Sequence, residues 1–440
     1  MGRYLGPVGF GQYTIVVAFL QFFAIFGDMG LTLITAQIIS QPQANEQKLL
    51  SNIFTLRIIS SLLFFLAAPI VSWFFPYPFK IKIAIAIFSL AFFFTSLTQV
   101  LTGLFQKKLQ IIKVTLSDLI NKIILVFSVL IVSAFNLGLL GIIIGGVLSN
   151  SVSFLWLFYS TRKIVKIKLS FDLNIWKKII KKAWPIAVSI VFNLIYLKTD
   201  TLILSLFHSE TAVGIYGATF RFLEILIMLP TMFMGLLLPL FTRYWAEKNI
   251  EKFKKTMQTA LEVLLIAAVP LVIGTLFLAE PIITLIVGKN FIAAAPVLKI
   301  IVLASAIVFI GTFYGHIIVA LNKQREMIWA YASTAFISLI FYFIFIPKYS
   351  YFGAAWSTVL AETLIAIICF WMVTKTTKIK PNFHIMPKIL LSSAVMAIFL
   401  YFFKNYNLFL TLILSITIYF FSLYRLKGLP RKLIKEISNF

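Results

Sequence analysis

The sequence has few charged residues and almost no cysteine or histidine. Aspartate and glutamate together number 14 in 440 residues, and all charged residues make up 12% of the chain. A single cysteine, Cys369, cannot form an internal disulfide or a thiolate cluster. His208, His316 and His384 lie in separate segments without the spacing of metal ligands. We therefore predict no metal site and no cofactor.

A glycine-rich phosphate-binding loop is also absent, so ATP is not the obvious energy source. What is present is apolar sequence, with 61% hydrophobic residues and a mean hydropathy of +1.01, which a soluble domain does not show. The apolar stretches are continuous rather than alternating, and each is long enough for a spanning helix of about 20 residues. The sequence thus predicts an all-α polytopic membrane protein with thirteen spans, at 11–40, 49–75, 83–105, 116–135, 138–161, 184–207, 213–242, 256–287, 294–321, 327–346, 352–373, 389–403 and 408–423.

Lysine and arginine residues gather in alternate loops. The loops after odd-numbered spans, together with the tail, carry 28 of the 39 basic residues. Because cytoplasmic loops of membrane proteins are enriched in lysine and arginine, these loops are predicted to be cytoplasmic. We predict a multi-pass protein of the cell (cytoplasmic) membrane with a cytoplasmic C-terminus. The net charge of +25 follows from this topology, and we predict no nucleic-acid partner.

Short segments repeat in the same order along the chain. Residues 8–11 resemble 213–216, residues 106–108 resemble 322–324, and Gly141 with 147–148 matches Gly353 with 359–360. Such internal repeats are typical of transporters. They predict two pseudo-symmetric six-helix lobes plus two C-terminal helices. The first lobe has only five predicted spans, so we infer that its first helix is missing, through truncation or a late start.

This repeat predicts the domain organisation. Basic and apolar residues alternate at helical spacing between the lobes, which favours a helix at the membrane surface there. The predicted parts are an N-terminal lobe of five helices at 1–161, a cytoplasmic interfacial linker at 162–183, a C-terminal lobe of six helices at 184–374, two appended helices at 389–424 and a cytoplasmic tail at 425–440.

Several motifs carry a resemblance to a known family. RYLGPVGFGQY at 3–13, followed by GDMGL at 27–31, resembles the opening of the polysaccharide-transport (O-antigen/oligosaccharide-lipid flippase) family of the MOP exporter superfamily. LKTDTL at 197–202 and AVGIYGATFRFLE at 212–224 resemble the start of that family's second lobe. The resemblance implies a flippase that moves undecaprenyl-diphosphate-linked oligosaccharide from the inner to the outer leaflet. It further implies alternating access of two lobes around a central cavity.

Charged residues inside predicted spans are the candidate site. Charge at the bilayer centre is costly and is usually paired or faces water. The lipid diphosphate that the resemblance implies needs cationic donors, so we expect these charges to line a cationic cavity. The substrate candidates are Arg57, Lys198 and Arg221. A carboxylate could couple transport to a proton or a sodium ion, and the candidates for that role are Asp28, Glu224, Glu362 and Asp200.

A plainer interpretation of the same residues stays open. Asp28 with Arg57, and Arg221 with Glu224 or Asp200, could be structural ion pairs that hold helices together. Arg221 and Glu224 are three apart and therefore share one helix face.

The expected partners are lipid-linked oligosaccharide, membrane lipids and H⁺ or Na⁺, and the expected state is a monomer. Alternatives are a multidrug or cation antiporter of the same superfamily, a lipid II flippase and, in a different class, a membrane-embedded glycan polymerase or ligase. The predicted outer loops are short, which disfavours an enzyme with an external catalytic domain. We predict that the chain is not an enzyme and has no catalytic residues.

Overall fold

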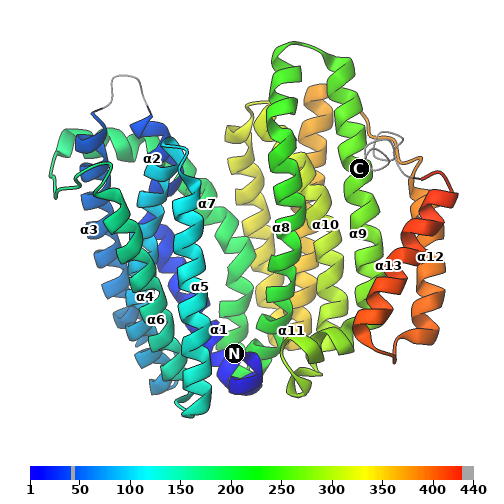
Figure 1. Cartoon of the computed structure of the whole chain (residues 1–440), viewed down its shortest axis with the longest axis horizontal. Coiled ribbons are helices and arrows are strands. Elements are labelled where there is room, and N and C mark those ends of the chain that lie inside the picture. The colour runs from blue at the N-terminus through cyan, green and yellow to red at the C-terminus, as the bar shows by residue number, and fades with distance from the viewer. Residues whose placement is uncertain (41–44, 429–440) are drawn as a thin grey trace. The chain divides into compact units, whose positions relative to one another are not determined.

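The computed structural model describes residues 1–40 and 45–428, and all regular elements within these ranges are helices (Figure 1). Helices suit a lipid environment because they satisfy their own backbone hydrogen bonds. The elements are α1 (Gly2–Asp28), α2 (Leu31–Ile39), α3 (Glu46–Ser72), α4 (Phe79–Lys107), α5 (Ile111–Ala134), α6 (Gly138–Thr161), α7 (Leu173–Phe207), α8 (Glu210–Ala246), α9 (Ile250–Ile286), η1 (Lys289–Phe291), α10 (Ala294–Ala320), α11 (Gln324–Thr377), α12 (Met386–Phe403) and α13 (Leu408–Arg425).

The helix lengths account for the predicted spans. Among the described residues, twelve helices are long and apolar enough to cross a membrane. One of them, α11, has 54 residues, which at 1.5 Å per residue is about 80 Å, against a hydrocarbon core of about 30 Å. It is interrupted at Ser350, where φ is 52° and ψ is −134°, and its two halves hold the predicted spans at 327–346 and 352–373. The prediction of an all-α polytopic membrane protein is thus confirmed, and the described residues hold twelve candidate spanning helices, of which α11 contains two of the thirteen predicted spans.

The first predicted span, 11–40, is not one helix. α1 ends at Asp28, and α2 begins at Leu31 after Met29 (φ 49°) and Gly30 (φ 76°) adopt the left-handed conformation. Position 30 requires glycine for two reasons. The left-handed conformation favours glycine, and a Cβ on Gly30 would lie only 2.8 Å from the carbonyl oxygen of Ala183 in α7. The apolar run therefore contains a break, which apolarity alone did not reveal.

The predicted interfacial linker helix and the sixth span form one continuous helix, α7. Asp172 caps it, since its Oδ1 accepts from the backbone nitrogens of Asn174 and Ile175, each at 3.2 Å. Lys48 of α3 lies 2.9 Å from the Asp172 carboxylate and, with the capping bonds, lowers the pKa of that carboxyl. Asn52 of α3 also accepts from the Asp172 backbone nitrogen at 3.0 Å. The start of α7 is thereby fixed to α3.

The chain forms two compact units, of which the first contains Met1 and Arg3–Gly214. In it α4 packs against α3 and α6, and α5 packs against α6. The core of this unit includes Ile179 and Ala183 from the N-terminal part of α7, beside residues of α2, α3 and α4. The second unit contains Gly2 and the chain from Ile215 onward. Since these units follow contacts rather than the sequence repeat, the lobe boundaries remain a prediction.

Within the second unit, α10 packs against α9 and α11, and the predicted appended helices α12 and α13 pack on each other and on α9. Tyr419 of α13 is buried, and its hydroxyl donates to the carbonyl of Ile266 in α9 at 2.9 Å. The two appended helices are therefore anchored to this unit by core contacts. The predicted tail at 425–440 lies outside the described residues beyond residue 428.

Candidate functional site

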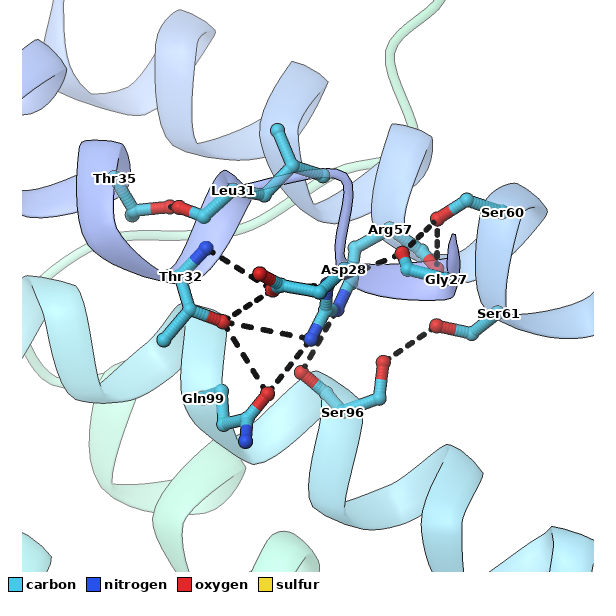
Figure 2. A network of polar contacts seen from close by, with 10 residues as sticks. All are labelled: Gly27, Asp28, Leu31, Thr32, Thr35, Arg57, Ser60, Ser61, Ser96 and Gln99. Carbon is cyan, nitrogen blue, oxygen red and sulfur yellow. Dashed lines mark hydrogen bonds and ion pairs between the residues drawn. The ribbon is translucent and has the colours of Figure 1, made fainter. Parts of the chain in front are cut away.

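Arg57 of α3 lies at the break between α1 and α2 and is almost completely buried, at 1% exposure (Figure 2). Its Nη1 contacts Asp28 Oδ1 at 2.5 Å and donates to the Gly27 carbonyl at 3.1 Å. Its Nη2 donates to Gln99 Oε1 at 2.7 Å and to Thr32 Oγ1 at 3.5 Å. The pairing of Asp28 with Arg57, which the sequence left open, is thus present.

The guanidinium has an acceptor for each of its N–H groups. The fifth, on Nε, donates to the Ser96 carbonyl of α4 at 3.2 Å, and a guanidinium carries five donors in all. Such complete matching stabilises a buried charge, whereas removal of one partner from a buried pair costs about 3–5 kcal/mol. In this geometry Arg57 would have to exchange one of its hydrogen-bond partners before it could bind a diphosphate.

The same cluster holds both ends of the broken helix. The carbonyl of Gly27, at the last turn of α1, accepts from Arg57 and from Ser60 Oγ at 2.8 Å. Positive charge at a helix C-terminus is favourable because it opposes the helix dipole. Asp28 in turn accepts from the backbone nitrogen of Thr32 at 3.2 Å and from the Thr32 hydroxyl, at the start of α2. The pair therefore acts as a cap for two helix ends.

Polar side chains on α4 continue outward from this cluster. Gln99 and Thr95 lie one turn apart and are both exposed. Thr95 Oγ1 donates to Asn150 Oδ1 of α6 at 2.9 Å, and Asn121 Nδ2 of α5 donates to the same oxygen at 3.1 Å. Gln99 lies about 12 Å from the C-terminal end of α4. Exposed polar groups at this depth face water or another polar surface rather than lipid.

Sequence reasoning missed this polar face. Its signal was the run of threonine, serine and glutamine at 95–99 inside an apolar span. Asp118 and Lys122 of α5, one turn apart, are likewise exposed at positions within a predicted span. Only intramembrane charges had been considered as candidates, and Asp118 was not among them. If neutral polar residues spaced one helical turn apart had also been counted as candidates, the sequence would have indicated Thr95 and Gln99 as well.

The remaining candidate in the first unit is the Lys198 and Asp200 pair on α7. Asp200 is buried, and its Oδ1 accepts from the backbone nitrogen of Thr201 at 2.5 Å and from the Thr201 hydroxyl at 3.2 Å. Lys198 is half-buried. Two residues apart on a helix point in nearly opposite directions, in agreement with these different exposures.

In the second unit, Arg221 and Glu224 of α8 form the i,i+3 ion pair that the sequence allowed, with Arg221 Nη1 at 2.7 Å from Glu224 Oε2. Their side chains are 49% and 31% exposed. This pair is therefore accessible, in contrast to the buried pair of Arg57 and Asp28. An accessible arginine can contact an additional anionic group without disrupting buried packing or buried hydrogen bonds.

Glu362 of α11 is different again, because it is 6% exposed and its carboxylate has no hydrogen bond or ion pair within the described part of the chain. The two halves of α11 touch where Cys369 Sγ lies 3.9 Å from Met327 Sδ. The two halves run antiparallel. Glu362 lies seven residues before Cys369, and Thr334 lies seven residues after Met327, so the two residues are at the same level on the facing sides of the two halves. The buried hydroxyl of Thr334 likewise has no hydrogen-bond partner among the residues that the structure describes.

Known proteins are similar to this chain at the levels of sequence and fold. A family model described as "Polysaccharide biosynthesis protein" matches residues 1–296. Capsular polysaccharide biosynthesis protein CapF of Staphylococcus aureus is 25% identical over 293 residues, which cover 65% of this chain and 73% of CapF.

Two solved structures share the fold. Lipid II flippase MurJ, in an inward closed conformation, has a TM-score of 0.81 at 19% identity, covering 98% of this chain and 95% of that one. An inward-facing multidrug resistance MATE family transporter of the MOP superfamily has a TM-score of 0.72 at 14% identity, covering 86% and 93%. At these identities the two structures show a common fold and leave the substrate open.

Proposed function

Because the chain belongs to the polysaccharide biosynthesis protein family, a flippase-like transporter family of the MOP superfamily, we propose that it flips lipid-linked oligosaccharide across the cytoplasmic membrane. The family resemblance noted in the sequence is confirmed. The proposed substrate is an undecaprenyl-diphosphate-linked oligosaccharide, and the proposed route is inner to outer leaflet by alternating access. The proposed orientation, with the C-terminus inside, rests on the basic loops.

The observation that carries this proposal is the exposed polar face of the first unit. Thr95 and Gln99 present a hydroxyl and an amide at membrane depth, with Asn150 bonded beside them. Sugars are recognised by such hydrogen-bonding groups, whereas a lipid-facing helix would not expose them. The buried Arg57 donates to the Gln99 amide oxygen and so helps to hold this amide in place on the face.

The cations proposed for the diphosphate are Arg221, Lys198 and Arg57. Arginine offers a bidentate fork to phosphate oxygens and lysine a point charge. Arg221 is the best placed, since half of its side chain is exposed. The charge of Arg57 is balanced by Asp28, so Arg57 contacts a diphosphate only after it exchanges a partner.

Ion coupling is proposed to use carboxylates, with Glu362 as the leading candidate and Asp28, Asp200 and Glu224 as the others. A buried carboxylate without a partner is costly, and binding of H⁺ or Na⁺ removes that cost. Glu362 meets this condition, whereas Asp28 is already held by Arg57.

Depletion of the protein in its host tests the transport proposal. We expect lipid-linked oligosaccharide to accumulate on the cytoplasmic leaflet and surface glycan to fall. A reconstituted assay gives the direct measurement, namely the fraction of labelled lipid-linked oligosaccharide that becomes accessible to an external sugar-modifying enzyme. Normal surface glycan after depletion, with no protein-dependent flipping in vesicles, would overturn the proposal.

The alternative with structural support is a drug exporter, because the fold is shared with a MATE family transporter. It predicts lower accumulation of cationic dyes in cells that express the protein. The cations proposed for the diphosphate, Arg221 and Lys198, would disfavour a cationic drug electrostatically, so we expect no change in dye accumulation. The glycan polymerase alternative predicts longer glycans on incubation with purified protein, although the similar proteins of known fold are transporters.

A further inference from the structure

An apolar groove of about 220 Å³ lies within the first unit, between α1, α3 and α7. Every residue that lines it is apolar. They are Ile25, Phe26, Met29, Phe64, Ile180, Trp184, Ala187 and Val191. Apart from the indole N–H of Trp184, the groove therefore has no side chain that could hydrogen-bond a sugar.

The part of α7 that lines the groove is a single stripe. Ile180, Trp184, Ala187 and Val191 recur at the i, i+4, i+7 spacing of one helix face. At 1.5 Å per residue this stripe is about 16 Å long. It begins ahead of the segment that is apolar enough to span the membrane, Ile190–Phe207, and runs into it. The groove thus leads from one membrane interface into the bilayer.

Lysines flank the N-terminal end of this stripe on one side. Lys177 precedes Ile180 by three residues and Lys181 precedes Trp184 by three, so each lysine adjoins a groove residue on the helix surface. Lys178 and Lys182 are two residues away from the same groove positions and face nearly the opposite way. All four side chains are exposed.

The volume and the chemistry restrict the occupant. Typical small-molecule pockets measure about 300–1,000 Å³, so this groove suits part of a chain rather than a whole drug or sugar. Lysines beside an apolar groove at a membrane interface match an anionic headgroup with its hydrocarbon tail in the groove. Phe26 and Met29 in the lining flank Asp28, so an occupant would touch the break between α1 and α2.

We propose that this groove is a docking site for a prenyl diphosphate lipid. Its isoprenoid chain lies along Ile180, Trp184 and Val191, and its diphosphate lies against Lys177 and Lys181. The proposal rests on the proposed function, because that function supplies the lipid carrier and the inner-leaflet orientation of the lysines. The groove would hold the carrier before its sugar reaches the polar face.

The first test compares two charge-matched variants of the full chain in phosphatidylcholine nanodiscs. Binding of undecaprenyl diphosphate is measured by native mass spectrometry for K177Q/K181Q and for K178Q/K182Q. We expect Kd to rise about 30-fold for the first variant, the effect of two lysines at a headgroup, and less than about threefold for the second. Equal effects of the two variants, or none, would overturn the headgroup assignment.

The second test fills the groove. Ala187→Phe places a ring in the lining, and Val188→Phe places the same ring on the next residue, outside the lining. We expect roughly tenfold weaker binding of undecaprenyl diphosphate for the first variant alone, with unchanged thermal stability in both. Competition by equimolar phosphatidylglycerol as strong as by the prenyl lipid would show a phospholipid site and overturn the proposal. Trp184→Ala, which enlarges the groove, is the second variant if Ala187→Phe does not fold.

The outcomes also separate this proposal from the proposed function. Wild-type protein that flips lipid-linked oligosaccharide while both groove variants and both lysine variants bind normally overturns only the groove. Wild-type protein that binds the prenyl lipid through Lys177 and Lys181, but flips no lipid-linked sugar, overturns the transport function and leaves the binding site.

Discussion

The two units of the molecule treat a buried charge in opposite ways. In the first, Arg57 and Asp28 are paired, and the arginine has an acceptor for every N–H. In the second, Glu362 is buried on α11 without an ion pair or hydrogen bond among the described residues. The first arrangement holds two helix ends in place, whereas the second leaves a buried carboxyl group without a compensating contact among the described residues.

This difference bears on which residues hold the structure and which respond to an ion. A buried charge whose partners are complete loses stabilising contacts in any rearrangement, so it favours one local geometry. A carboxylate without partners changes its energy when a proton or sodium ion arrives, and this change can shift a conformational equilibrium. We therefore propose a mainly structural role for the first cluster and a coupling role for Glu362.

The largest expected effect is on stability, from Arg57→Ala. It leaves Asp28 without its cation and two helix ends without a cap, so we expect a loss of about 3–5 kcal/mol. The measurement is SDS-induced unfolding of the purified protein. The double variant D28A/R57A should lose less than the sum of the single variants, because it removes both charges together. A loss below about 1 kcal/mol for Arg57→Ala would show that the cluster does not hold the fold.

The next effect is on transport, from Glu362→Gln. Glutamine keeps the shape of glutamate but cannot carry the charge, so the fold should be retained. We expect at least a tenfold loss of the flipping that an ion gradient stimulates, measured in vesicles with and without the gradient. Thr334→Val, which removes the facing hydroxyl, should give a smaller loss. Gradient-stimulated flipping equal to wild type in Glu362→Gln would remove this residue from the coupling step.

The helical framework was predictable from the sequence because a lipid bilayer leaves few alternatives. A stretch of about 20 apolar residues is expected to form a spanning helix, and the basic residues gather in alternate loops between such stretches. The exact course within the apolar runs was less predictable. The break after Asp28 lies in a run that stays apolar on both sides, and only Gly27 and Gly30 indicated it.

The candidate site was predictable in part, for a similar reason. Charged residues inside spans are rare, so Asp28, Arg57 and Glu362 could be selected from the sequence. Their partners could not. Gln99 and the Ser96 carbonyl meet Arg57 through packing of α4 on α3, and the absence of partners around Glu362 depends equally on how the halves of α11 pack.

A smaller effect separates the buried pair of the first unit from the exposed pair of the second. Arg221 and Glu224 are 49% and 31% exposed, so solvent or a wet cavity screens them. We expect Arg221→Ala to destabilise the protein by less than about 1 kcal/mol in the same SDS unfolding measurement. Flipping should nevertheless fall about tenfold, since Arg221 is proposed to contact the diphosphate. A large loss of stability with normal flipping would assign the structural role to this pair too.

The smallest effect concerns the cap of α7. It tests whether an ion pair outside the membrane also stabilises the folded state through its charge. Lys48 and the capping bonds lower the pKa of Asp172, so its carboxylate stabilises the folded state above the pKa of the unfolded chain, about 3.9. This contribution is lost as the pH falls through the lowered pKa. We expect Asp172→Asn to lower Tm by about 1–2 °C at pH 7 and by nothing measurable near pH 2.5. Lys166→Gln is the control, because that lysine is exposed and lies outside the cap. A Tm difference that persists unchanged at low pH would show that Asp172 acts through its shape rather than its charge.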